Sequence, residues 1–416
     1  MFKSLIQALR QPTVFWVVLT AGGILAISQG IRLSLGLIVS PMNTGTGWGI
    51  ATISLALALG QLVWGLMQPV AGAAADRWGT RMVLMAGIVI MAGGAALAAM
   101  ATEAWVMGLA LGVLMAAGSG ISSFSVLIGE ATQKLSASTR HASSSLINAF
   151  GSLGQFIFAP VTQGLIHALG WASAMASLAA LTLGGLPLIA RLTRRQGPLN
   201  EPVSAPNADA AEPAIGLRAA LRQAMRDPSF GLLNLGFFTC GFHTAFLVTH
   251  LPTEVNLCGL GPEVASGSLA LIGISNVVGT LYLGSCMSKF RSKYLLSGMY
   301  ASRALAVLLY MAAPKTPLTF YAFAVAVGFT WLATLPVTAN VVTQLFGVRY
   351  LATLFGLTLF SHQLGSFFGA WLGGVAVSAW GDYAWMFWAD VALAIMATLV
   401  HLPIREGPTE LRGLAT

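Results

Sequence analysis

The distribution of apolar residues along the chain is the feature that most constrains its fold. Twelve apolar segments, separated by short polar connections, are each long enough to cross a hydrocarbon core about 30 Å thick as a helix. They lie at about 14–38, 48–71, 82–101, 104–129, 142–166, 170–192, 229–252, 263–287, 294–313, 317–342, 350–377 and 383–403. A helix satisfies its own backbone hydrogen bonds in lipid. The pattern therefore predicts an all-α membrane protein with twelve transmembrane helices.

The composition agrees with this class. Only 8% of the 416 residues are charged and 56% are hydrophobic, whereas about a quarter of the residues in a soluble domain are charged. The net charge of +8 could suit a nucleic acid, but the cations lie in the connections, so we expect no such partner. Cys240, Cys258 and Cys286 show no metal or redox spacing. Because no catalytic constellation is visible either, we expect no metal, no cofactor and no enzymatic activity.

The cations also predict an orientation. Nearly all of them fall on one side of the twelve-span arrangement, whereas Lys315 falls on the other side and Arg32 and Arg303 lie inside spans. The side rich in Lys and Arg is the cytoplasmic one, so we expect both termini in the cytoplasm. The first apolar run is too long for a signal peptide and is read as a retained span. We expect a multi-pass protein of a bacterial inner membrane.

A polar, proline-containing stretch at 193–228 divides the chain. It separates an N-terminal half of six spans, 1–192, from a C-terminal half and tail, 229–416. We expect the stretch to be a cytoplasmic linker that ends in a short amphipathic helix on the membrane surface. The arginines of that helix are Arg218, Arg222 and Arg226.

A charged sequence, GAAADRWGTR at 72–81, lies between the second and third spans. It resembles the G-x-x-x-D-R-x-G-x-R signature of the major facilitator superfamily, and an eroded copy at 284–293 suggests duplication. The resemblance implies two six-helix halves that rock about a central site. It also implies that Asp76, Arg77 and Arg81 latch the cytoplasmic side in one state. We expect a monomer.

Several other stretches look like the bacterial relatives of the monocarboxylate and oxalate–formate transporters. They are the Arg32 segment with Pro41-Met42 and Gly47-Trp48, Gln61 to Pro69, Gly241 to Phe246, His250-Leu-Pro and Ser361 to Gly365. Members of that family carry a substrate-binding arginine in the eighth span, where 273–282 has no cation here. Arg32 would therefore have to take over that role.

Arg32 is the main candidate for substrate binding. A cation inside a span costs at least about 2.5–3.5 kcal/mol on insertion scales, and arginine can hold a carboxylate with two hydrogen bonds. The alternative is an arginine that pairs with a carbonyl or snorkels outward. Further candidates are polar side chains in the fifth, seventh, tenth and eleventh spans, each of which an interhelical hydrogen bond would also explain. These are Asn148, Gln155, His243, Trp331, Asn340, His362 and Gln363.

Titratable residues inside spans suggest proton coupling. His243 and His250 lie in the seventh span, and histidine ordinarily titrates near neutral pH. Arg303 and Asp390 have opposite charges at similar depth in the ninth and twelfth spans, which predicts a buried ion pair. The alternative for Asp390 is a proton relay.

These features predict a secondary active transporter that takes up a small organic anion together with a proton. The alternative is proton-driven efflux of a drug or metabolite, although the Gly-Pro-x-x-Gly-Gly element usual in such exporters is absent from 154–164. A membrane sensor or scaffold built on a transporter fold is a further alternative.

Overall fold

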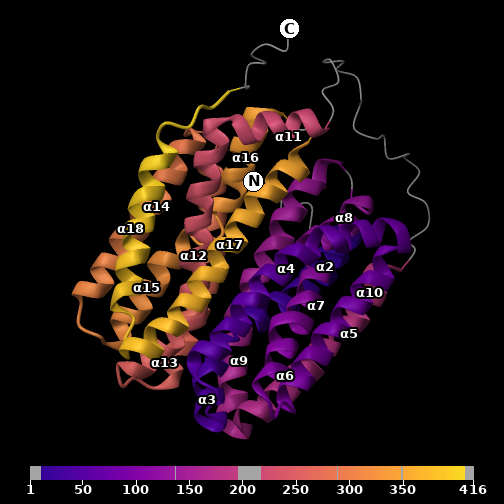
Figure 1. Cartoon of the computed structure of the whole chain (residues 1–416). Helices are drawn as coiled ribbons and strands as arrows, with labels where there is room; N and C mark the ends of the chain where they lie inside the picture. Colours follow the sequence, from indigo (N-terminus) through magenta and orange to yellow (C-terminus); the bar gives the residue numbers. More distant parts are fainter. Residues whose placement is uncertain (1–10, 136, 195–216, 288, 348–349, 408–416) are drawn as a thin grey trace.

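The computed structural model describes residues 11–135, 137–194, 217–287, 289–347 and 350–407, and every regular element within those ranges is a helix (Figure 1). In chain order these are α2 (Pro12–Leu33), α3 (Gly36–Thr46), α4 (Ile50–Trp78), α5 (Thr80–Ala99), α6 (Ala104–Leu109), the π-helix η1 (Ala110–Met115), α7 (Ala116–Ile121), α8 (Phe124–Gln133), α9 (Ala137–Leu183), α10 (Gly185–Leu192), α11 (Leu217–Arg226), α12 (Pro228–Leu257), α13 (Pro262–Cys286), α14 (Ser292–Ala312), α15 (Pro317–Phe329), α16 (Thr334–Phe346), α17 (Leu351–Trp380) and α18 (Ala384–His401).

The helices occupy all of the predicted spans. Ten helical stretches are long and apolar enough to cross a membrane. One of them, Leu146–Leu192, covers two predicted spans, because α9 bends at Gly170, where φ is 78°. α17 adds a further helix of 30 residues. The all-α membrane fold is therefore confirmed, and the arrangement is consistent with twelve crossings.

Four of the predicted spans are interrupted, the sixth by a single-residue turn at Gly184 between α9 and α10. The first breaks between α2 and α3, where the amides of Ser34 and Leu35 bond to carbonyls three residues back. The fourth contains η1 and a turn between α7 and α8, and the tenth breaks between α15 and α16. Irregular backbone at membrane depth is tolerated where it is buried in protein or lines a cavity. In transporters, such discontinuous helices form the binding sites.

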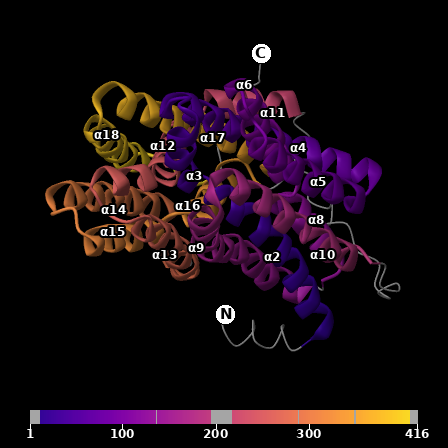
Figure 2. The same cartoon turned by 90° about the horizontal axis from the view of Figure 1, so that it is seen from below.

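The chain forms two side-by-side bundles, which the two views in Figures 1 and 2 show as a purple N-terminal body and an orange-to-yellow C-terminal body. They pack through α3 against α12, α4 against α17, and α9 against α13. Asn256 of α12 donates to Ser40 of α3 at 3.0 Å, and Asn276 of α13 donates to Ser152 of α9 at 2.6 Å. These bonds join the bodies in the middle of the bundle and at its α3 end.

The predicted helix at the end of the linker is present as α11, which packs on α12 through the buried Ala224 and exposes Met225. The part of the linker at 195–216 lies outside the described residues, as do the N-terminal residues 1–10.

The latch residues lie where α4 meets α5. Gly79 joins the two helices with φ at 86°, in the left-handed region that glycine tolerates. Arg77 and Arg81 on either side of it are exposed. Asp76 lies in α4, and its side chain is outside the described part of the structure. The latching role remains a prediction.

The eroded second copy of the signature, at 284–293, forms hydrogen bonds with the segment after α18. Arg291 Nε bonds to Glu406 at 2.6 Å, and the Lys293 amide bonds to the other oxygen of the same carboxylate at 2.7 Å. The Lys293 ammonium also donates to the carbonyls of Leu402 and Ile404. An acidic group at a helix N-terminus is favourable, so Glu406 holds the start of α14.

Candidate functional site

Arg32 lies in the last turn of α2, immediately before the first break. Its Nε donates to Gln29 Oε1 at 2.9 Å, and its Nη1 donates to Gln61 Oε1 at 3.0 Å. The guanidinium lies 4.3 Å from the centre of the Trp64 ring, a cation–π contact. Gln29 is one turn back on the same helix, whereas Gln61 and Trp64 come from neighbouring turns of α4. These three side chains fix the guanidinium in one orientation.

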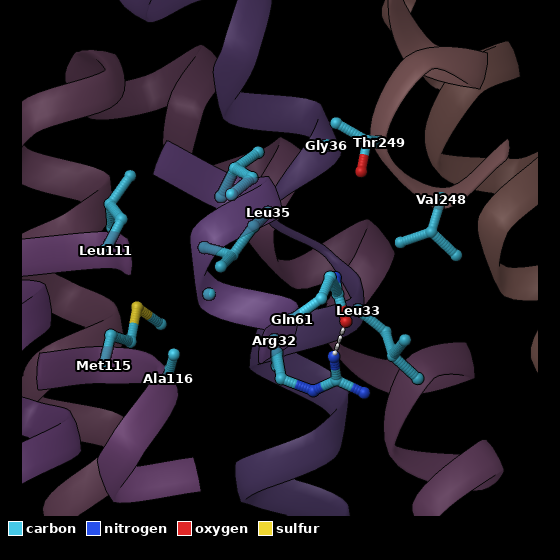
Figure 3. A pocket seen from close by; sticks show the side chains of 12 residues that line it. Arg32, Leu33, Leu35, Gly36, Gln61, Leu111, Met115, Ala116, Val248 and Thr249 are labelled. Carbon is cyan, nitrogen blue, oxygen red and sulfur yellow. Dashed lines mark hydrogen bonds between the residues drawn. The ribbon is translucent and has the colours of Figure 1, made fainter. Parts of the chain in front are cut away.

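A small pocket, partly open to solvent, lies beside this arginine. Figure 3 shows Arg32 and Gln61 between Leu111 and Met115 of the N-terminal body and Val248 of the C-terminal body. Both bodies therefore contribute walls. The twelve described lining residues include one cation and no acidic side chain. The positive charge consequently lacks a counter-ion in this pocket.

The remaining donors of Arg32 determine what it can bind. Arginine has five N–H donors, of which one on Nε and one on Nη1 are committed to the two glutamines. In the described part of the chain, Nη2 has no acceptor. A carboxylate can therefore accept two hydrogen bonds end-on, from Nη1 and Nη2. It cannot bind side-on through Nε, because that donor is bonded to Gln29.

Gln155 and Gln363 both lie at contacts between the two bodies. Gln363 of α17 is buried and packs where a side chain on Gly65 of α4 would collide with it, at 2.5 Å. Gln155 of α9 is buried opposite Gly273 of α13. Gln363 Oε1 and Gln155 Nε2 lack a hydrogen-bond partner among the described residues. Neither residue lines the pocket around Arg32.

His243 and Asp390 form a buried pair inside the C-terminal body. His243 Nδ1 of α12 donates to Asp390 Oδ2 of α18 at 2.6 Å, and the side chains are 1% and 0% exposed. The ring of Trp331, also buried, lies 6.0 Å from the imidazole ring. Three sequence candidates are thus brought together, but away from the Arg32 pocket.

The structure shows no direct ion pair between Arg303 and Asp390 among the described residues, although the sequence predicted one. Arg303 is buried, and its Nη2 donates to the backbone carbonyls of Thr330 and Trp331, the latter at 2.9 Å. Its Nη1 donates to Cys240 Sγ at 3.3 Å. These carbonyls end α15, and the C-terminus of a helix carries partial negative charge. Similar depth in the membrane suggested the wrong partner, because the interruption of the tenth span was not anticipated.

Both ring nitrogens of His250 have hydrogen-bond partners. Its Nε2 donates to the carbonyl of Ala370 at 2.7 Å, so its Nδ1 accepts from the Tyr383 hydroxyl at 3.0 Å. A side chain on Gly373 would lie 2.3 Å from the imidazole ring. Both nitrogens of the neutral ring are satisfied, which favours a structural role over proton coupling.

Asn340, His362 and Asn148 do not line the Arg32 pocket either. Asn340 donates to Ser292 Oγ at 2.8 Å, which ties α16 to the start of α14. His362 packs on Phe237, with ring centres 4.9 Å apart. Asn148 is a partly buried residue of α9. For Asn340 the structure supplies the interhelical bond that was the alternative to substrate binding.

The residues that hold Arg32 in place were not predicted from the sequence. Gln29 could have been found, because it lies three residues before Arg32 and so faces the same side of a helix. Gln61 and Trp64 come from the next span, and no local pattern pairs them with Arg32. Only their presence in the transporter-like stretch from Gln61 to Pro69 marked them.

Comparisons with known proteins agree with this architecture. The model of the Major Facilitator Superfamily matches residues 18–357. The bovine protein "Monocarboxylate transporter 13" is 26% identical over 409 residues, covering 94% of this chain and 91% of that protein. The Escherichia coli "Uncharacterized MFS-type transporter YhjX" is 23% identical over 320 residues, covering 76% of this chain and 77% of that protein.

Among solved structures, a bacterial homologue of the human lysosomal transporter Spinster, described as inward-facing and unoccupied, has a TM-score of 0.71. It is 16% identical and covers 94% of each chain. At this identity the likeness concerns the fold.

Proposed function

The chain belongs to the major facilitator superfamily, and from this premise we propose that it transports a small, monocarboxylate-like organic anion whose charged group binds to Arg32. It is a multi-pass membrane transporter and not an enzyme. The class of substrate is the proposed part.

The position of Arg32 carries the proposal. It is a partly buried cation at a helix break, in a pocket whose described lining holds no acidic residue. Burying an unpaired charge is costly, and a bound anion offsets that cost. The rest of the lining is largely apolar, with side chains such as Leu57, Leu111 and Met115. A pocket with one cation and an otherwise apolar lining matches a small ligand that has one carboxylate and few other polar groups.

The relatives support the same class of substrate. The bovine monocarboxylate transporter 13 and a human monocarboxylate transporter 11, which is 26% identical over 398 residues, both match more than nine-tenths of this chain.

Alternating access would come from rocking of 1–192 against 229–405. Arg32 lies between the two bodies, so it would face each side of the membrane in turn. Asp76, Arg77 and Arg81 would then latch the cytoplasmic side in one of the two states. We place the protein in a bacterial inner membrane with both termini and the linker in the cytoplasm. Protease that cleaves 195–216 from the outside of intact cells would contradict this orientation.

We further propose uptake driven by protons, with His243 as the coupling residue. Its buried contact with Asp390 supplies a titratable pair inside the bundle. Efflux is the alternative direction, and it would appear in reconstituted vesicles as movement of the acid against an imposed proton gradient.

A ligand-stabilisation screen tests the substrate class. Purified protein would be heated with acetate, lactate, pyruvate, benzoate, neutral amides of the same shape, and quaternary ammonium compounds. A ligand that binds only the folded state raises the melting temperature. We expect one or more monocarboxylates to stabilise the protein and their amides to leave it unchanged. Stabilisation by the cations alone would contradict the proposal.

A further inference from the structure

We infer that the proton-binding group is the pair of His243 and Asp390, and that α12 links its protonation to the wall of the Arg32 pocket. The inference rests on the proposed proton-coupled transport of an anion and assigns its coupling to two residues. It gives Asp390 a partner other than the predicted Arg303, and it adopts the alternative of a proton relay for that residue.

The geometry of the pair identifies the atom that takes the proton. A carboxylate accepts, so the hydrogen of the 2.6 Å bond is on His243 Nδ1. The neutral imidazole then has its lone pair on Nε2. This nitrogen and Asp390 Oδ1 have no hydrogen-bond partner among the described residues. A new N–H bond at Nε2 would give an imidazolium whose charge the adjacent carboxylate neutralises.

Other titratable groups lie near this pair, but in the described part of the chain His243 is the histidine in direct contact with a carboxylate. The titratable or charged side chains grouped around this level of the C-terminal body are Asp390 on α18, Arg303 and Tyr300 on α14, Cys240 on α12 and His362 on α17. The described residues of α3 and α16 carry none, and α13 has Glu263, Tyr282 and Cys286 only toward its ends. Arg303 stays protonated.

α12 connects this pair to the substrate pocket. Val248 and Thr249 follow His243 by less than two helical turns and line the pocket around Arg32. On the other side of the same contact lies Gly36, the first residue of α3. A side-chain carbon on Gly36 would lie 2.1 Å from the carbonyl oxygen of Val248. The two backbones therefore touch directly, and a shift of α12 changes the pocket wall.

Protonation of His243 changes how strongly α12 is held against α18. An imidazolium and a carboxylate attract more strongly than a neutral imidazole and a carboxylate. The proton therefore holds α12 on α18 and keeps Val248 against Gly36. An anion on Arg32 favours the same closed wall, because Val248 and Thr249 then help to enclose it. By linkage, each ligand strengthens the binding of the other, which is the requirement for symport.

The first test uses no substrate. Because an imidazolium quenches indole emission more than a neutral imidazole does, Trp331 reports on His243. The fluorescence difference between wild type and Trp331→Phe would be titrated from pH 5 to pH 8. We expect one transition, which is lost in His243→Gln and unchanged in His250→Gln. The transition should also be altered in Asp390→Asn, because the imidazolium then lacks its carboxylate partner. A transition that survives unchanged in both His243→Gln and Asp390→Asn would overturn the inference.

The second test uses proteoliposomes and the monocarboxylate that stabilises the protein best, or lactate if none does. We expect His243→Gln and Asp390→Asn to lose about tenfold or more of the accumulation driven by a pH gradient. Exchange of labelled for unlabelled acid without a gradient should persist, since Arg32 is intact. Accumulation at the wild-type level in either variant would overturn the inference. If wild type moves no acid at all, the proposed function fails, and the fluorescence titration still decides whether the pair binds a proton. If one variant does not fold, the other supplies both measurements.

Discussion

The guanidinium of Arg32 and the side-chain carbonyl of Gln61 meet at 3.0 Å across α2 and α4. Gln29 holds the same guanidinium from the other side at 2.9 Å, and Trp64 lies against its face. None of these neighbours carries a charge. They orient the cation without neutralising it, so its charge remains available to a ligand.

The glutamine contact predicts the effect of Gln61→Ala. The charge of Arg32 stays, but the guanidinium loses one of two side-chain acceptors. We expect the affinity for a stabilising monocarboxylate to fall by about five- to tenfold, the equivalent of roughly one hydrogen bond. The dissociation constant of purified protein measures it. Gln133→Ala, an exposed glutamine at the end of α8, is the matched control. Equal affinity in Gln61→Ala and the control would show that this contact does not orient the arginine.

The contact between Gly36 and Val248 predicts that Gly36→Ala opens the α3 end of the bundle. The added carbon would lie 2.1 Å from the Val248 carbonyl oxygen, and overpacking of this kind costs about 1–3 kcal/mol. Leu37, which is 3% exposed, would then become accessible. We would measure the rate at which Leu37→Cys reacts with a maleimide, in a Cys258→Ser background.

Gly93→Ala in α5 is the control, because a side chain there meets no atom within 4 Å. The rate should rise in Gly36→Ala and stay constant in Gly93→Ala. A rate that rises equally in both variants, or in neither, would mean that Gly36 does not set this closure.

Double-mutant cycles can measure which residue, His243 or Arg303, is coupled more strongly to Asp390. We expect a coupling free energy between His243 and Asp390 of about 1–3 kcal/mol, within the range for residues in contact. The coupling between Arg303 and Asp390 should be smaller, because the guanidinium is held by the carbonyls that end α15. Alanine variants and thermal unfolding supply the values. A larger coupling for Arg303 and Asp390 would restore the original pairing.

His250 provides a contrasting histidine. His250→Gln and Tyr383→Phe should each destabilise the protein by about 1–3 kcal/mol, because each leaves a buried polar partner unsatisfied. Neither should alter the pH dependence of transport between about 5 and 8, the range in which an ordinary histidine titrates. Unfolding temperatures and initial transport rates measure the two effects. A pH profile that flattens in His250→Gln would assign the proton to this residue instead.

The fold followed from the sequence because membrane helices obey one strong rule. Backbone groups in lipid must bond within their own segment, so apolar length alone predicted the spans. The interruptions beside Arg32 and at Thr330 were not predictable, since they depend on contacts with other helices. The same limit explains the site. Arg32 was recognisable because a lone cation in a span is rare, whereas Gln61 needed the packing of α4 on α2.

The titratable residues show where such reasoning fails. From the sequence alone, four residues were similar candidates for a functional role, because each is a polar group inside a span: His243, His250, Arg303 and Asp390. Their roles diverge through partners that only the packing provides. His250 meets a carbonyl and a hydroxyl, Arg303 meets a helix end, and His243 meets a carboxylate.

Binding of a monocarboxylate to Arg32 variants tests the proposed function most directly. The acid that gives the largest rise in melting temperature would be titrated into wild type, Arg32→Lys and Arg32→Gln by calorimetry. Lysine keeps the charge but loses the planar, two-pronged donor set, so we expect weaker binding, by about tenfold. Glutamine removes the charge, and binding should be nearly abolished. Wild-type affinity in Arg32→Gln, or a preference of the pocket for cations, would contradict the organic-anion assignment.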